Sequence, residues 1–364
     1  MRIVVAMSGG VDSSVAAALL AQQGHDVIGL SMQLYDQSGG RDALRFGSCC
    51  TLDDLHDARR VAARIGFPHY IVNFEEKFAE TVISNFVREY ASGRTPIPCV
   101  HCNGDLKFSL LAERAAGFDA DCVATGHYAR VERDEATGRY RLLRGADSAK
   151  DQSYFLFTLT QEQLARAVFP VGSLDKAQVR EHARRLGLAI AEKPDSHEIC
   201  FVPDGDHASF LAKRGAASGH GSIVDTSGRQ VGRHDGVHRF TVGQRKGLGL
   251  AAGIPLYVVG LDAATNSVTV GPRADLERRD VSASGVNWIS GSPPATGARV
   301  AAQIRHRHIP APATVRSTDA NHVRIEFDEP QIAVAPGQAL VLYEGNEVVG
   351  GGWIDGNYEL RTKN

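Results

Sequence analysis

Apolar residues in the first part of the chain follow two alternating periods. Short continuous apolar runs cover residues 2–7, 26–34 and 68–74, and between them residues 11–24 and 52–66 place apolar side chains at helical spacing. A helical period indicates an amphipathic helix, whereas a short apolar run bounded by turn residues is typical of a buried strand. The resulting order of strand, helix, strand, helix, strand is typical of a parallel sheet covered by crossover helices. The pattern therefore predicts an α/β domain.

The pattern changes in the second half of the chain. Residues 175–188 still read as an amphipathic helix, but a glycine-rich stretch follows up to Gly221, and the remaining chain has short β-rich runs broken by Gly and Pro. Many short strands at this spacing suggest a small barrel. We therefore predict an α/β domain at residues 1–205, a small β-rich central domain at 206–275 and a C-terminal β-barrel-like domain at 276–364.

Composition narrows the functional classes only slightly. The chain has 364 residues, which suits two or three domains, and its apolar runs are much shorter than the ~20 residues of a membrane helix. The N-terminus lacks the basic and apolar segments of a signal peptide, so a cytoplasmic protein without a membrane partner is expected. The net charge is −2, so a nucleic-acid partner would have to bind local basic patches.

The turn between the first predicted strand and helix reads SGGVDSS, and we call its residues 8–13 the glycine loop. Glycines let the backbone approach a ligand closely, and N–H groups at a helix N-terminus bind anions. The dinucleotide and Walker fingerprints are both absent. An ordinary turn with Asp12 or Ser13 as a helix cap is the alternative. The full segment resembles the pyrophosphate loop of the N-type ATP pyrophosphatases, which adenylate a carbonyl or carboxylate oxygen and release pyrophosphate.

Five further segments narrow the resemblance. They occur in one order along the chain: PIPCVHCNGDLKF at 96–108, ATGHYAR at 124–130, KDQSYFL at 150–156, DSHEICF at 195–201 and FTVGQRKGLG at 240–249. Together they resemble the tRNA-specific 2-thiouridylases over essentially the whole chain. The resemblance implies an ATP-dependent tRNA-uridine 2-sulfurtransferase, which replaces oxygen by sulfur at C2 of the wobble uridine in the tRNAs for lysine, glutamate and glutamine.

The same resemblance implies ligands and partners. Mg²⁺ would share the charge of the released pyrophosphate, and a persulfide carrier or cysteine desulfurase would donate sulfur. The residues implied to contact ATP are Ala6, Met7, Ser8, Gly9, Gly10, Val11, Asp12, Ser13, Met32 and Gly126. Met32 reads equally well as a core residue at a strand end. His127 is assigned no proton-transfer step.

Basic and polar residues of three segments are implied to contact tRNA. Each basic residue taken singly also reads as a solvated surface charge, and Arg245 and Lys246 are further basic positions of this kind. The target uridine would have to be flipped out to reach ATP. The implied tRNA contacts are Ile97, Pro98, Cys99, Lys150, Asp151, Gln152, Arg305, His306 and Arg307.

Six cysteines are too few and too unevenly spaced for a secreted disulfide framework. Cys99 and Cys102 form a C-x-x-C with a helix predicted to start at or just after Cys102, and a thiol at a helix N-terminus is more readily ionised. This favours Cys102 as a nucleophile. From the resemblance, Cys200 carries a persulfide that supplies sulfur, and attack by Cys102 then leaves a Cys102–Cys200 disulfide, which a thiol reductant resets.

The sequence departs from one common family pattern, which has Asn and Asp at the positions of Ile97 and Cys99. The Asp is a candidate proton donor, so its replacement puts that role in doubt. Cys99, Cys102 and Cys200 together could instead hold a [4Fe–4S] cluster with one open iron for sulfide. The persulfide is preferred over the cluster, and zinc is less favoured than either. Alternatively, the two cysteines of the C-x-x-C are ordinary buried residues without a chemical role. Structural roles are predicted for Cys49, Cys50 and Cys122.

Two other functions remain open at this point. An amidating ligase of the same superfamily would couple adenylation to ammonia, but it would not explain the C-x-x-C and a distant cysteine. A non-catalytic RNA-binding or sulfur-carrier module would retain a relic loop, and the intact SGGVDSS argues against it.

Overall fold

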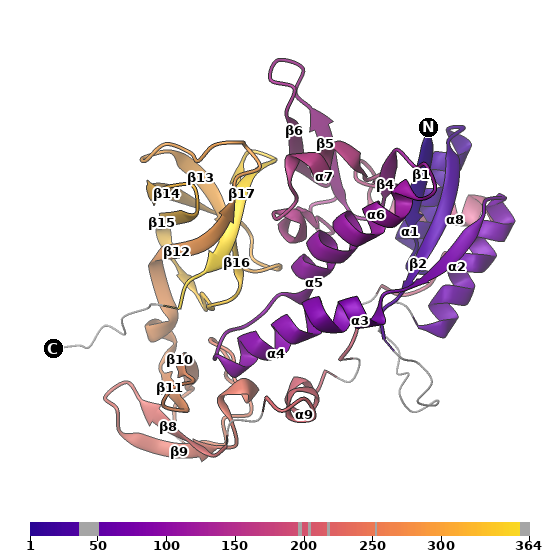
Figure 1. The fold of residues 1–364 in the computed structure, drawn as a ribbon. Coiled ribbons are helices and arrows are strands. Elements are labelled where there is room, and N and C mark those ends of the chain that lie inside the picture. The colour runs from indigo at the N-terminus through magenta and orange to yellow at the C-terminus, as the bar shows by residue number, and fades with distance from the viewer. Residues whose placement is uncertain (36–50, 196–198, 203–204, 217–218, 252, 357–364) are drawn as a thin grey trace. The chain divides into compact units, whose positions relative to one another are not determined.

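The computed structural model describes residues 1–35, 51–195, 199–202, 205–216, 219–251 and 253–356 (Figure 1). Cys49 and Cys50, predicted to be structural, lie outside these residues. The chain divides into two compact units. The first comprises Met1–Val82, Cys99–Gly205 and Asn346–Val348, and the second comprises Ile83–Pro98, Asp206–Gly345 and Val349–Asn364. Residues 83–98 thus pack with the C-terminal half of the chain.

A five-stranded parallel sheet forms the centre of the first unit, with strand order β3-β2-β1-β4-β7. The central strand β1 is buried on both faces, and Val4 and Val5 are fully inaccessible. Strands buried in this way read as continuous apolar runs, as observed here. The parallel-sheet prediction is therefore confirmed. The strands are β1 (Arg2–Ala6), β2 (Asp26–Gln33), β3 (His69–Asn73), β4 (Cys122–Ala124) and β7 (Ala167–Val168).

Three helices share a hydrophobic core with β1: α1 (Val11–Gln22), α2 (Leu52–Ile65) and α8 (Lys176–Arg185). Helix α1 is rich in alanine and valine and is buried over most of its surface, so it carries no polar face. Helices α2 and α8 are amphipathic, and each begins with a capping box, formed by Thr51 with Asp54 and by Asp175 with Gln178. Cys122 of β4 packs against this core, and burial raises the pKa of its thiol. These contacts fix the start of α1 against the sheet.

A helical run carries the C-x-x-C and starts earlier than predicted. It consists of α5 (Pro98–His101), the π-helical segment η3 (Cys102–Leu110) and α6 (Leu111–Ala116), which follow one another without a break. Proline suits the first position of a helix because its missing N–H is not needed there. Cys102 therefore lies one turn inside the helix, and the prediction that the helix begins at or just after Cys102 is wrong.

The remaining elements of the first unit connect these parts. Strands β5 and β6 form an antiparallel hairpin whose register pairs Ala129 with Arg144. The segment Asn346–Val348 joins this unit, where Glu347 forms ion pairs with Arg139 and Arg141. The elements are α3 (Glu75–Phe78), η2 (Ala79–Ile83), β5 (Ala129–Arg133), β6 (Tyr140–Arg144), η4 (Ser153–Leu156) and α7 (Gln161–Arg166).

The second unit contains a small four-stranded sheet with order β10-β11-β8-β9. Its core is made of Ile223, Val258, Val268 and Val270 of the strands together with residues between β9 and β10, which are Val237, Phe240 and Leu248. The Phe86 ring of α4 packs edge-on against Phe210 of α9. The elements are α4 (Ser84–Ala91), α9 (His207–Ala212), β8 (Gly221–Asp225), β9 (Gln230–His234), η5 (Val237–Arg239), β10 (Tyr257–Asp262), β11 (Ser267–Gly271) and η6 (Arg273–Leu276).

The C-terminal part of the second unit is a closed barrel of six strands. The strands follow the order β12-β15-β14-β13-β16-β17, and β17 pairs with β12 to close the sheet. Full closure removes exposed sheet edges. The predicted small β-rich domain and C-terminal β-barrel are therefore both confirmed. The strands are β12 (Glu277–Asn287), β13 (Arg299–Gln303), β14 (Ala311–Thr318), β15 (His322–Ile332), β16 (Ala339–Glu344) and β17 (Glu347–Ile354). Within the described residues, no helix is both long enough and apolar enough to span a membrane.

Candidate active site

The glycine loop joins the C-terminal end of β1 to the N-terminus of α1. Gly9 has a left-handed backbone with φ +74°, and a Cβ at this position would lie 2.1 Å from the carbonyl oxygen of Asp54. Only glycine therefore fits between the loop and the start of α2. Gly10 is the N-cap of α1 and has no side chain to satisfy the first N–H groups of the helix, so Asp12 and Ser13 are not the cap. The open N-terminus is suited to an anion.

Serine hydroxyls surround the same backbone. The Ser13 hydroxyl accepts a hydrogen bond from the Ser8 N–H at 3.2 Å and lies 3.2 Å from the Ser8 hydroxyl. Ser14 donates to the carbonyl oxygen of Gly10 at 2.8 Å. These hydrogen bonds hold the loop in one shape. The loop offers backbone N–H groups and hydroxyl donors, and Gly9 places no Cβ where the loop comes closest to Asp54.

Gly126 lies directly against the first turn of α1. A Cβ at Gly126 would come within 2.4 Å of the Ser13 nitrogen, so a side chain does not fit there. Its neighbours Thr125 and His127 are buried and share a hydrogen bond of 2.7 Å. Burial lowers the pKa of His127 well below its usual range, so the ring is neutral at physiological pH.

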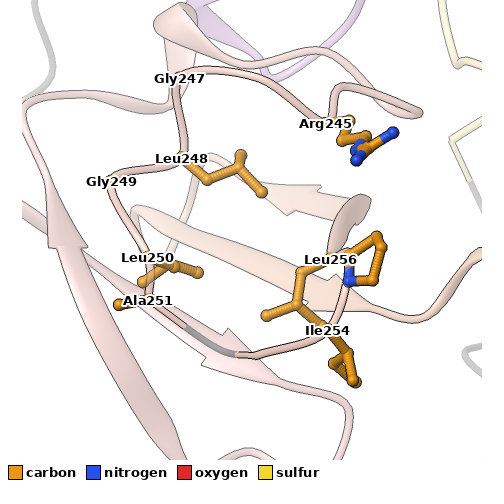
Figure 2. A pocket seen from close by; sticks show the side chains of 9 residues that line it. Arg245, Gly247, Leu248, Gly249, Leu250, Ala251, Ile254 and Leu256 are labelled. Atoms are coloured by element: carbon orange, nitrogen blue, oxygen red, sulfur yellow. The ribbon is translucent and has the colours of Figure 1, made fainter.

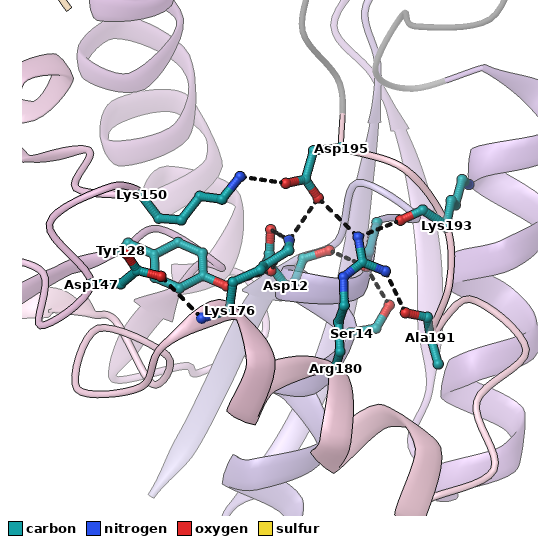
Figure 3. Close-up of polar contacts among 12 residues, drawn as sticks. Asp12, Ser14, Tyr128, Asp147, Lys150, Lys176, Arg180, Ala191, Lys193 and Asp195 are labelled. Atoms are coloured by element: carbon teal, nitrogen blue, oxygen red, sulfur yellow. Dashed lines mark hydrogen bonds and ion pairs between the residues drawn. The ribbon is translucent and has the colours of Figure 1, made fainter. Parts of the chain in front are cut away.

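Asp12 is the first member of a chain of alternating charges (Figure 3). The Tyr128 hydroxyl donates to its Oδ1 at 2.8 Å, and Lys176 Nζ lies 2.7 and 2.9 Å from its two oxygens. Lys176 also contacts Asp195 Oδ1 at 2.7 Å, and Lys150 contacts Asp195 Oδ2 at 2.8 Å. Burial alone would raise the pKa of Asp195, but hydrogen bonds from the two lysines lower it to about 2. Asp195 is therefore fully ionised at neutral pH.

A second group of charges also contacts the glycine loop. Lys193 Nζ donates to the Gly9 carbonyl oxygen at 3.1 Å and lies 2.6 Å from both Asp54 Oδ1 and Asp57 Oδ2. Burial alone would lower the pKa of Lys193, but hydrogen bonds to the two carboxylates outweigh it and raise that pKa. The ammonium group is therefore permanently charged where it touches the loop.

The site fits a nucleoside triphosphate. Gly9 and Gly126 let the loop pack against neighbouring backbone where a Cβ would collide, and the hydroxyls and helix N–H groups supply donors for phosphate oxygens. Mg²⁺ needs only one or two carboxylates when phosphate oxygens complete its coordination, and Asp12 is a carboxylate on this loop. Met32 is buried in β2 with 5% of its surface exposed.

The three cysteines of interest occupy two segments of the first unit. Cys99 is exposed, whereas Cys102 and Cys200 are partly buried. Residues three apart on a helix share one face, so Cys99 and Cys102 lie on the same side of it. Cys200 lies in a turn closed by the Val202 N–H and the Ile199 carbonyl oxygen at 2.8 Å. The next residue, Phe201, packs on Phe78 and anchors that turn.

The described side chains do not form the ligand set of a metal cluster. Among them, no three His, Cys, Asp or Glu residues are grouped closely enough to hold a metal ion. The [4Fe–4S] alternative on Cys99, Cys102 and Cys200 stays a prediction. His101, the further zinc ligand considered, lies 3.1 Å from Asp105 Oδ2.

The residues implied to contact tRNA have varied environments. Ile97 and Pro98 are buried, whereas His306 and Arg307 are exposed and the Arg305 guanidinium donates to the Ile332 carbonyl oxygen. In the first unit, Lys150 pairs with Asp195, Asp151 accepts hydrogen bonds from Gly145 and Ser153, and Gln152 accepts one from Tyr128. These three residues have defined structural contacts within the chain.

The end of the FTVGQRKGLG segment and residues that follow it line a pocket of about 430 Å³ in the second unit (Figure 2). Leu248, Leu250 and Leu256 line it, and Arg245 is the charged residue among its described lining residues. An apolar surface beside a guanidinium suits the face of a nucleobase. The pocket belongs to the second unit, whereas the glycine loop belongs to the first.

Sequence analysis missed Lys176 and Lys193 and gave Asp195 no role of its own. Lys193 and Gly9 are 184 positions apart, and Lys176 and Asp12 are 164 apart. Lys176 follows the cap of an ordinary amphipathic helix, which gives no sign of a distant partner. Only Asp195, the first residue of DSHEICF, lay within a segment that the resemblance had singled out.

Comparisons with known proteins agree over the whole chain. Three protein-family models match, described as the tRNA methyl transferase HUP domain at residues 1–204, the tRNA methyl transferase PRC-barrel domain at 208–272 and the aminomethyltransferase β-barrel domain at 278–354. A solved 4-thiouridine synthetase in complex with RNA and ATP aligns at 16% identity with 58% of this chain and 50% of its own, at a TM-score of 0.35, too low to add to the assignment.

Two curated relatives carry the same name. The tRNA-specific 2-thiouridylase MnmA of Geobacter metallireducens is 55% identical, with 97% of this chain and 96% of the relative covered. The protein of the same name from Geotalea uraniireducens is 53% identical, over 99% of this chain and 96% of the relative. With this identity over nearly the full length of both chains, the protein belongs to the tRNA-specific 2-thiouridylase family.

Proposed function

We propose that this chain is an ATP-dependent tRNA sulfurtransferase that replaces O2 of the wobble uridine by sulfur in the tRNAs for lysine, glutamate and glutamine. The observation that carries the proposal is the glycine loop beside an open helix N-terminus, where Gly9 of the loop and Gly126 packed against Ser13 leave no space for a side chain. Full-length relatives named for this activity support the same substrate. The cytoplasm is the proposed compartment, because tRNA, ATP and thiol reductants are available there.

The glycine loop is proposed to hold the triphosphate of ATP. Uridine O2 attacks the α-phosphorus, so that AMP becomes bonded to O2 and pyrophosphate leaves. The N-terminus of α1 and the Ser8 and Ser13 hydroxyls face the charge that develops on the leaving pyrophosphate, and such preorganised donors stabilise a transition state. Bound Mg²⁺ would neutralise part of that charge, with Asp12 as its carboxylate on the loop.

The cysteines are proposed to carry the sulfur. A sulfur-donor protein converts Cys200 to a persulfide, whose terminal sulfur attacks C2 while AMP departs with the oxygen. The Cys102 thiolate then attacks Cys200 Sγ and breaks the bond to the transferred sulfur, which stays on C2 as the thiocarbonyl. The product disulfide between Cys102 and Cys200 is reduced by a dithiol, which becomes oxidised in turn.

The proposal is tested with unmodified tRNA, ATP, Mg²⁺ and a persulfide donor. We expect nucleoside mass spectrometry to find 2-thiouridine only at the wobble position, together with AMP and pyrophosphate. Cys102→Ser and Cys200→Ser should form no thiolated nucleoside, whereas Cys122→Ser, which alters a thiol packed against the core, should retain it. Formation of AMP without thiolated nucleoside in the wild type would contradict the proposal.

A further inference from the structure

Residues 191–195, which we call the Lys193 segment, are held by charged side chains along their whole length (Figure 3). Arg180 of α8 donates to the carbonyl oxygens of Ala191 and Lys193 at 2.6 and 3.0 Å. At the far end, the Asp195 carboxylate pairs with Lys150 and Lys176. A short segment without helix or strand structure is therefore fixed in place by contacts on both sides of Glu192.

The Lys193 side chain ties this segment directly to the backbone of the glycine loop. Its ammonium group has three acceptors within 3.1 Å, one of which is the Gly9 carbonyl oxygen. Lys193 is 28% exposed and its carboxylate partners Asp54 and Asp57 are 11% and 12% exposed, so these ion pairs are poorly screened by solvent. Removing the ammonium would leave two carboxylates in a mostly buried place without their common partner.

The other end of the Lys193 segment reaches the same loop through a second route. Asp195 contacts Lys176, and Lys176 contacts both oxygens of Asp12 in the first turn of α1. The glycine loop is therefore connected to the segment at Gly9 by Lys193 and at Asp12 by Lys176 with Asp195. The phosphates of a nucleotide bound at the loop bring negative charge close to Lys193 and Lys176, which here bind carboxylates. The contacts of the loop at Gly9 and at Asp12 therefore both change when the nucleotide binds.

Along the sequence, the segment is followed by the proposed sulfur carrier. Cys200 follows Asp195 by five residues, which limits its distance from that anchor to about 18 Å. We propose that Lys193 is a positioning residue: it ties the segment leading to Cys200 to the glycine loop, so that ATP bound at the loop sets the position of the Cys200 thiol. The inference rests on the proposed function for the identities of ATP as ligand and Cys200 as sulfur carrier.

Alkylation of Cys200 measures this coupling without tRNA. The full chain, reduced beforehand, is treated with iodoacetamide with and without Mg-ATP, and the Cys200 peptide is quantified by mass spectrometry with the Cys122 peptide as an internal reference. In the wild type we expect ATP to change the alkylation rate of Cys200 at least about fivefold, the lower end of common coupling strengths. In Lys193→Met the rates with and without ATP should agree within about twofold by the same reasoning.

Two variants make the test specific. Glu192→Gln alters the adjacent residue, whose side chain is 72% exposed and contacts Arg184, and it should keep the wild-type response. Asp57→Asn keeps the shape of a Lys193 partner but removes its charge, and it should give an intermediate response even if Lys193→Met folds poorly. The inference is overturned if ATP binds the wild type, as shown by equilibrium dialysis, without changing Cys200 alkylation, or if Lys193→Met retains the full response.

Turnover separates positioning from a merely structural role. In Lys193→Met, thiolated uridine formed per pyrophosphate released should fall about tenfold, beyond any fall in pyrophosphate release itself, as expected for a misplaced reacting group. Equal loss of both products would instead assign Lys193 to loop stability and overturn the inference. A wild type whose Cys200 responds to ATP but which never thiolates tRNA would contradict the proposed function and leave this inference standing.

Discussion

Alanine at Gly9 should damage the glycine loop far more than alanine at Gly24, although both glycines have a left-handed backbone. Their φ angles are +74° and +81°. A Cβ at Gly9 would lie 2.1 Å from the Asp54 carbonyl oxygen, whereas nothing lies within 4 Å of a Cβ at Gly24. Since ordinary contact begins at 3.4 Å, the loop and the start of α2 would have to separate by 3.4 − 2.1 = 1.3 Å. Gly24→Ala is therefore a matched control for backbone strain alone.

The magnitudes follow from these contacts. A left-handed backbone costs alanine about 1–2 kcal/mol at either position. Overpacking against Asp54 adds about 1–3 kcal/mol at Gly9 only, which gives a total of about 2–5 kcal/mol. Displacement of a reacting group by about 1 Å can lower a rate about 100-fold. We therefore expect tRNA-dependent pyrophosphate release to fall about 100-fold in Gly9→Ala and to stay near wild type in Gly24→Ala.

Two assays on both variants test whether the close approach of Gly9 to Asp54 matters for stability and activity. Urea unfolding gives the loss of folding free energy, and pyrophosphate release with saturating tRNA gives the loss of activity. If the two variants lose the same stability and the same activity, the close approach of Gly9 to Asp54 has no functional consequence, and the reasoning is refuted.

Three other predictions concern different parts of the chain. Because the pKa of Asp195 is lowered to about 2, its ion pairs should stabilise the fold by about 2 kcal/mol above pH ~4 and lose this effect as the pH falls toward 2. Urea unfolding should therefore show a gap between wild type and Asp195→Asn that shrinks below pH ~4, and a constant gap would contradict this. Phe327→Ala in the barrel core should cost about 3–5 kcal/mol by the same assay, and a cost below about 1 kcal/mol would contradict that packing. Arg307→Ala should weaken tRNA binding and lower its salt-dependence slope by about 1, whereas an unchanged slope would exclude a phosphate contact.

The sequence was most informative where structure is set locally. The glycine loop was predicted because a strand period, a glycine turn and a helix period follow one another within about twenty residues. The C-terminal barrel was predicted because its short strands and turns repeat along one stretch of chain. Gly126 was predicted to contact ATP only through the family resemblance, and nothing in ATGHYAR itself indicates the packing against Ser13 that the structure shows.

What was missed depends on long-range contacts or on local ambiguity. Lys193 and Lys176 reach the loop across more than 160 positions, and an ordinary lysine gives no sign of such a partner. The helix that carries Cys102 begins at Pro98 because proline is compatible with a first turn, although it also occurs in loops. The tRNA contacts remain predictions.

The most direct test of the central claim is the ratio of pyrophosphate released to 2-thiouridine formed in one reaction with tRNA, ATP and a persulfide donor. Adenylation of O2 predicts one pyrophosphate for each thiolated uridine, with AMP as the accompanying product and neither product formed without ATP. Thiolation accompanied by ADP and phosphate, or thiolation without pyrophosphate, would contradict a pyrophosphate-releasing site at the glycine loop.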